Sequence, residues 1–153
     1  MGSFGAKSAE RLATCHPGLQ NLFNEVVKSY PYDCSILTGH RGKEEQDKAV
    51  AEGRSKTPWP TGNHNAMPSN AVDACPSPYQ FPEEEDRKKA LAGDKEALAR
   101  YVIATGALYH MAGYIMRVSQ DQGLKTRWGG AWDGKLNKPG QFMDLDHWEI
   151  PKA

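Results

Sequence analysis

Hydrophobic residues recur at helical intervals in two long parts of the chain. In the first part, residues 8–30, the apolar positions are Leu12, Leu19, Leu22, Phe23, Val26 and Val27. Pro17 interrupts this pattern early, so it predicts a short helix followed by a longer one. The second part starts after Gly93 and Asp94 and predicts one long amphipathic helix that ends near Gly123.

Shorter apolar stretches lie between and after these helices. The stretches that predict strands are residues 32–38, 70–75, 124–128 and 142–150, and a glycine-rich turn at 129–140 joins the last two. Charged segments at 42–53 and 83–92 predict two further short helices. Helices and strands in this order, ending in a β-hairpin, predict an α+β fold, with a small antiparallel sheet and flanking helices.

Residues 55–82 break the regular pattern. They contain six prolines and many small polar residues, and the short strand at 70–75 is the only regular element expected among them. Irregular segments of this length in a compact domain are usually functional or disordered. Because Trp59, Met67, Tyr79 and Phe81 lie along this segment, we expect an ordered, functional loop.

Composition narrows the class of protein. The 153 residues suit a single domain spanning 1–153, with a core from about 10 to 150. Nineteen basic and nineteen acidic groups give a net charge of zero, which argues against a nucleic-acid binder. The longest uncharged stretch, 101–116, is shorter than the roughly 20 residues of a membrane span, and no secretory signal is visible. Three cysteines without a C-x-x-C motif favour a reducing compartment.

Three groups of polar residues are candidates for chemistry. His64 precedes Asp73 across the proline-containing loop, Asp144 and His147 lie near the C-terminus, and Arg41 follows the first strand. Two imidazoles and one carboxylate form the ligand set of a hydrolytic zinc site, in which a further carboxylate can act as general base. On a regular strand Asp144 and His147 face opposite sides, so their convergence requires a bulge or a strand end. Spacing alone leaves a hydrogen-bonded structural pair open as the alternative.

The motifs as a set resemble a known family. H-N-A-M-P-S-N-A-V-D, followed about seventy residues later by D-L-D-H-W-E-I, resembles the zinc peptidases of peptidoglycan. This family includes the Van-type D-alanyl-D-alanine carboxypeptidases and dipeptidases and the L-alanyl-D-glutamate endopeptidases that bacteriophages use as endolysins. T-G-H-R-G-K-E-E-Q and R-W-G-G-A-W also match, so the resemblance runs from about residue 10 to 150. The length is most like that of the compact phage endolysins, so we expect a single peptidase catalytic domain and no separate cell-wall-binding domain.

The resemblance implies a role for each candidate. The zinc ligands fall on His64, Asp73 and His147, and the catalytic acid/base falls on Asp144, for which Asp146 is the rival. Arg41 matches an arginine that stabilises charge on the scissile carbonyl oxygen, and Gln46 lies in the same block. The chain departs from the signature at Gly62 and Ser69 and has two more residues between the first ligands. A loop absorbs such an insertion easily, so we expect the pocket shape to differ more than the ligands.

These implications define the expected function. We expect a zinc-dependent phage endolysin that cleaves the L-Ala–D-Glu bond of the stem peptide of bacterial peptidoglycan. A D-Ala-D-Ala carboxypeptidase or dipeptidase of the same family, or a non-catalytic zinc-stabilised wall-binding module, remain the alternatives. We further expect a monomer without membrane or nucleic-acid partners, held in the host cytoplasm until lysis. Trp59, Tyr79, Trp128 and Trp132 are candidates for the walls of its groove, with core packing as the alternative role.

Overall fold

The computed structural model describes residues 2–136 and 142–152 and confirms the α+β class. Its helices are α1 (Ala6–Ala13), α2 (Pro17–Ser29), α3 (Lys43–Ala51), the 3₁₀ turn η1 (Asn63–Asn65), α4 (Glu84–Leu91) and α5 (Lys95–Asp121). Its strands are β1 (Cys34–Thr38), β2 (Ala71–Pro76), β3 (Arg127–Trp128) and β4 (His147–Glu149). Each expected helix forms within a few residues of its predicted bounds.

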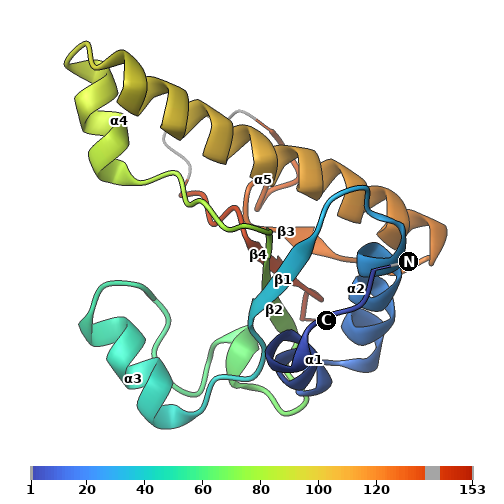
Figure 1. Ribbon diagram of the computed structural model, residues 1–153. Helices are drawn as coiled ribbons and strands as arrows, with labels where there is room; N and C mark the ends of the chain where they lie inside the picture. The colour runs from blue at the N-terminus through green and yellow to red at the C-terminus, as the bar shows by residue number, and fades with distance from the viewer. Residues whose placement is uncertain (1, 137–141, 153) are drawn as a thin grey trace.

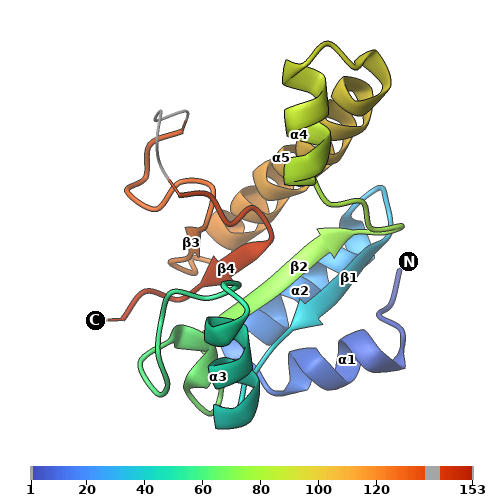
Figure 2. The ribbon, with the colours of Figure 1, turned by 90° about the vertical axis from the view of Figure 1, so that its left-hand side faces the viewer.

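The four strands form one antiparallel sheet in the order β1-β2-β4-β3 (Figure 2). The last strand in the sequence therefore lies between β2 and β3, and its first residue, His147, pairs with Asp73 of β2. On the other side of β2, Thr38 pairs with the same Asp73 after an irregularity in the register of β1. The sheet thus brings three distant segments of the chain to one point.

One face of the sheet is covered by α2 and α5, whereas α3 lies on the side of the opposite face (Figures 1 and 2). The apolar positions predicted in α2 are all buried, and those of α5 meet them across a core that includes Trp148 and Ile36. Burial of one large apolar side chain contributes about 1.5–3 kcal/mol to stability. This continuous core holds the sheet rigidly from behind and leaves its other face free for a site.

The C-terminal hairpin is smaller than predicted. The expected strands 124–128 and 142–150 shrink to two and three residues, because a tight turn replaces regular pairing before His147. The His147 amide donates to the Asp144 carbonyl at 3.2 Å, and Gly129 exchanges backbone hydrogen bonds with this segment. A Cβ at Gly129 would lie 2.1 Å from the Asp144 carbonyl oxygen, so only glycine fits there. Part of the predicted turn, 137–141, lies outside the described residues.

The proline-rich segment is ordered, as expected. Ser69 is fully buried, its amide donates to the Thr14 carbonyl at 2.9 Å, and its hydroxyl donates to the Ala71 carbonyl at 2.7 Å. The Arg41 amide donates to the His64 carbonyl at 2.8 Å, which ties the segment to the end of β1.

At the opposite end of the molecule, α4 and the start of α5 project away from the sheet (Figure 1).

In the described part of the chain, no helix combines the length and apolar character needed to cross a membrane. Cys15, Cys34 and Cys75 are buried thiols without a disulfide.

Candidate metal centre

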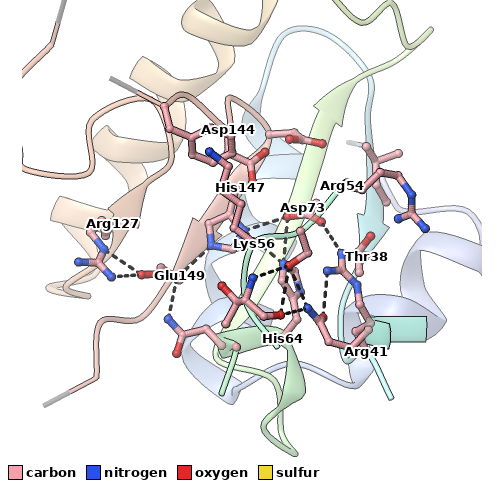
Figure 3. Close-up of a pocket in the computed structure, with 18 of the residues that line it drawn as sticks. Thr38, Arg41, Arg54, Lys56, His64, Asp73, Arg127, Asp144, His147 and Glu149 are labelled. Atoms are coloured by element: carbon pink, nitrogen blue, oxygen red, sulfur yellow. Dashed lines mark hydrogen bonds and ion pairs between the residues drawn. The ribbon is translucent and has the colours of Figure 1, made fainter. Parts of the chain in front are cut away.

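Three of the predicted site residues meet at one point on the open face of the sheet (Figure 3). The Nε2 atom of His64 lies 3.1 Å from the Oδ1 atom of Asp73, and the Nδ1 atom of His147 lies 3.1 Å from the same oxygen. The two ring nitrogens are 3.2 Å apart. Within the described residues, this is the one group of three potential ligands close enough to hold a metal ion.

Each member of the triad is placed by a different local structure. His64 lies in η1, Asp73 lies in the middle of β2, and His147 begins β4 directly opposite Asp73. The turn formed by residues 144–147 supplies the strand end that the sequence analysis required. Asp144 therefore lines the same pocket as His147, although strand alternation alone would separate the two.

The hydrogen bonds around the two histidines determine which nitrogens face inward. The Nδ1 atom of His64 lies 2.8 Å from the Gly39 carbonyl, which only accepts, so this nitrogen carries the hydrogen. The Nε2 atom of His147 lies 3.0 Å from the carboxylate of Glu149 and is likewise the donor. In the neutral rings, the inward nitrogens are then both lone pairs, and they face a carboxylate. Such a cluster attracts a cation, and its donor set fits a zinc ion.

The pKa values of Asp73 and His147 also show that the cluster stabilises positive charge. Burial opposes ionisation of Asp73, but the charge of His64 and hydrogen bonds from His147 and His64 hold the pKa of Asp73 well below its usual range. Burial also opposes the protonated form of His147. Hydrogen bonds to Asp73 and Glu149 outweigh it and raise the pKa of His147 to about 10.

Glu149 is a candidate site residue that the sequence analysis did not single out. Its buried carboxylate accepts hydrogen bonds from His147, from the Asn63 amide at 2.6 Å and from the Arg127 guanidinium, with Nε at 2.8 Å. Burial raises the pKa of Glu149, but these donors lower it to about 2. The spacing H-x-E on a strand puts both side chains on one face, and this signal could have identified Glu149.

Arg41 lies beside the free oxygen of the triad carboxylate. Its Nη2 atom is 3.7 Å from the Oδ2 atom of Asp73, and its Nη1 atom donates to the Gln46 side chain at 3.3 Å. Gln46 is buried and also accepts from the Asn65 amide at 3.1 Å. Gln46 therefore links Arg41 to the loop that carries His64.

The two aspartates that compete for the base role differ in environment. Asp144 is partly exposed on the pocket wall, whereas Asp146 is buried. Burial, the charge of Asp73, a hydrogen bond with Asp144 and the charge of Asp144 raise the pKa of Asp146 to about 8. Because Asp144 is partly exposed in the pocket and Asp146 is buried, Asp144 can contact both a water molecule and a bound substrate. This difference in exposure favours Asp144 as the base.

The pocket around these residues encloses about 1050 Å³. Of the four aromatic residues considered for the groove, Tyr79 and Trp132 line this pocket. Trp128 is buried and stacks on Trp148 with ring centroids 6.0 Å apart, so its role is core packing. Trp59 is absent from the described wall. The space is large enough for several residues of an extended peptide.

Comparisons with known proteins bear on the family and on the fold. A family model described as phage L-alanyl-D-glutamate peptidase matches residues 1–85. Among solved structures, the chain is similar to the Serratia marcescens L-Ala D-Glu endopeptidase ChiX, with 22% identity and a TM-score of 0.59. That similarity covers 97% of this chain and 89% of the Serratia chain, and it supports the fold. None of the curated proteins matches the chain.

Proposed function

The chain belongs to the phage L-alanyl-D-glutamate peptidase family and is a peptidase of the L-Ala–D-Glu bond, and we propose that it is a zinc-dependent peptidoglycan hydrolase. In this proposal His64, Asp73 and His147 hold the zinc ion. The observation that carries the metal assignment is the convergence of two imidazole nitrogens on one carboxylate oxygen at 3.1 Å. The second nitrogen of each ring already donates a hydrogen bond, to the Gly39 carbonyl or to Glu149, which is typical of metal-binding histidines.

The metal would polarise the peptide carbonyl and lower the pKa of a bound water toward 7. Asp144 takes a proton from the attacking water and passes it to the leaving amine of the D-glutamyl residue. Its partial exposure on the pocket wall allows contact with both water and substrate. Asp144 thereby acts first as base and then as acid.

Arg41 assists at the carbonyl oxygen. A guanidinium stabilises the negative charge that develops on this oxygen in the transition state, and it does so best when held in place beforehand. The contacts of Arg41 with Asp73 and Gln46 supply this preorganisation. Glu149 acts only through His147, whose ring it orients.

The family membership favours the endopeptidase over the D-Ala-D-Ala carboxypeptidase and the dipeptidase. A non-catalytic wall-binding module would need neither the partly exposed Asp144 nor a pocket of this size beside the triad. In the proposed setting, a monomeric endolysin remains in the host cytoplasm until lysis and then acts on the bacterial wall.

Digestion of purified peptidoglycan tests this proposal. The zinc-loaded protein should release products with new N-terminal D-Glu, which mass spectrometry identifies. Treatment with a chelator should abolish the release, and added zinc should restore it. Free D-alanine as the product would instead indicate the carboxypeptidase, and a folded, zinc-loaded protein that releases nothing would favour the binding module.

A further inference from the structure

The proposed substrate carries a negative charge close to the cleaved bond. A glutamyl residue on the leaving side gives its amine to the L-Ala–D-Glu bond and keeps two carboxyl groups. Only one of these continues the peptide chain, so the other is a free carboxylate within a few bonds of the leaving nitrogen. The pocket must hold this charge near the carboxylate of Asp144, which repels it. A positively charged side chain on the pocket wall would offset this repulsion.

Most cations on the pocket wall are already paired. Arg41 lies 3.7 Å from Asp73, Arg54 lies 2.6 Å from Glu52, and Arg127 binds Glu149. Two lysines remain, Lys56 and Lys152, and neither has a carboxylate partner among the described residues. The ammonium group of Lys152 donates to the Thr61 carbonyl at 2.8 Å.

Lys56 reaches across the pocket. It follows α3 on the proline-rich segment, and its Nζ atom lies 4.7 Å from the ring centroid of Phe142, on the segment that leads to Asp144. The same pocket wall contains the metal triad, and Figure 3 shows Lys56 among its residues. A cation on an exposed aromatic ring is only weakly bound. An incoming carboxylate offers a stronger, charge-assisted hydrogen bond and can displace Phe142 from the ammonium group.

We propose that Lys56 binds the free carboxylate of the D-glutamyl residue on the leaving-group side. This inference rests on the proposed function and adds a specificity residue to it. The ammonium group of Lys56 lies over Phe142, two residues before Asp144, and all three residues line the same pocket. A carboxylate bound to Lys56 therefore holds the leaving nitrogen near the group that protonates it. The enzyme accordingly distinguishes a D-glutamyl residue from the same residue in its amidated form.

The test combines two substrates with five proteins. The substrates are a soluble N-acetylmuramoyl tripeptide whose D-Glu carboxylate is free and the same compound with that carboxylate amidated. The proteins are the wild type, Lys56→Met, Lys56→Arg, Lys152→Met and a control. The control, Lys28→Met, changes an exposed lysine at the end of α2, outside the pocket wall. Thermal unfolding of each protein confirms that it is folded, as expected for substitutions of exposed side chains.

The wild type should cleave the free carboxylate form with a kcat/KM about tenfold above that of the amide, mainly through KM. Lys56→Met should lose this preference by slowing only on the carboxylate substrate, and Lys56→Arg should keep most of it. Added salt should reduce the preference, because the contact is exposed. Lys28→Met should behave as the wild type does.

The outcomes separate the inference from the proposed function. Equal cleavage of both substrates by the wild type, or an unchanged preference in Lys56→Met, would overturn the role of Lys56. If the preference disappears in Lys152→Met but persists in Lys56→Met, the carboxylate binds Lys152, and the proposed role of Lys56 is overturned. If the zinc-loaded wild type cleaves neither substrate, the proposed function fails instead.

Discussion

The residues that line the pocket fall into two sets that differ in how firmly they are held. His64, Asp73, His147 and Glu149 are largely buried, and their polar atoms lie 2.8–3.2 Å from one another or from the Gly39 carbonyl. Lys56, Tyr79, Phe81 and Phe142 are exposed and make mainly ring contacts. Under the proposed function, the buried set would carry the chemistry and the exposed set would contact the substrate.

The largest effect should follow from loss of a triad member. His147→Ala removes a metal ligand and leaves Glu149 without its donor at 3.0 Å, so activity should fall on the order of a thousandfold or more. Steady-state kinetics on soluble muropeptides measure this, and metal analysis should show weakened binding. Full activity with normal metal content would remove His147 from the ligand set.

Substitution of the proposed base should separate chemistry from metal binding. Asp144→Asn keeps the shape of the side chain but cannot accept a proton, so kcat should fall about 10²–10⁴-fold while zinc remains bound. Asp146→Asn is the matched comparison, because Asp146 is buried and its pKa is raised to about 8. A greater loss in Asp146→Asn than in Asp144→Asn would reverse the assignment.

The orientation of His147 by Glu149 predicts an intermediate effect. Glu149→Gln weakens the acceptor for the His147 ring, and metal affinity should fall about 10–100-fold, measured by competition with a chromogenic chelator. Glu85→Gln changes an exposed glutamate on α4 and should leave the affinity unchanged. If Glu149→Gln binds zinc as tightly as the wild type, the carboxylate has only a structural role.

The close approach at Gly129 predicts a loss of stability. Gly129→Ala forces a Cβ against the Asp144 carbonyl and should lower the free energy of unfolding by about 1–3 kcal/mol, measured by urea denaturation. Gly113→Ala on α5 is the control, since a Cβ there meets nothing within 4 Å and should stabilise the helix slightly. Equal stability of the two variants would mean that the turn adapts.

The smallest effect should come from the aromatic wall. Tyr79 and Phe81 lie with ring centroids 5.6 Å apart and are both exposed on the pocket. Tyr79→Ala should raise KM a few fold, about the contribution of one partly buried aromatic contact, with little change in kcat. A fall in kcat as large as that of Asp144→Asn would contradict the distinction between the buried residues that carry the chemistry and the exposed residues that contact the substrate.

The sequence predicts most of the fold because its local signals agree with its tertiary contacts. The apolar positions of α2 and α5 are the core, and Pro17 starts α2 where it was expected to interrupt the first helical part. The C-terminal strands were predicted too long, since no local signal shows that residues 144–147 form a turn. That turn depends on Gly129, which comes from a distant segment.

The candidate site shows the same limit. The motifs predict which residues meet, and the structure brings His64, Asp73 and His147 together as expected. The contacts that orient them come from groups without a motif of their own, such as the Gly39 carbonyl and the Asn63 amide. Lys56 was not singled out either, because a lysine in a polar loop has no sequence feature that distinguishes it from other exposed lysines.

The position of β4 between β2 and β3 also sets the order in which the triad can assemble. His64 and His147 are 83 residues apart in the chain, so the two rings meet only after β4 has paired with β2. A polypeptide cut off before residue 144 would lack one histidine of the triad and the proposed base together. The completed sheet is therefore a precondition for the proposed chemistry, and the site cannot form from the first two strands alone.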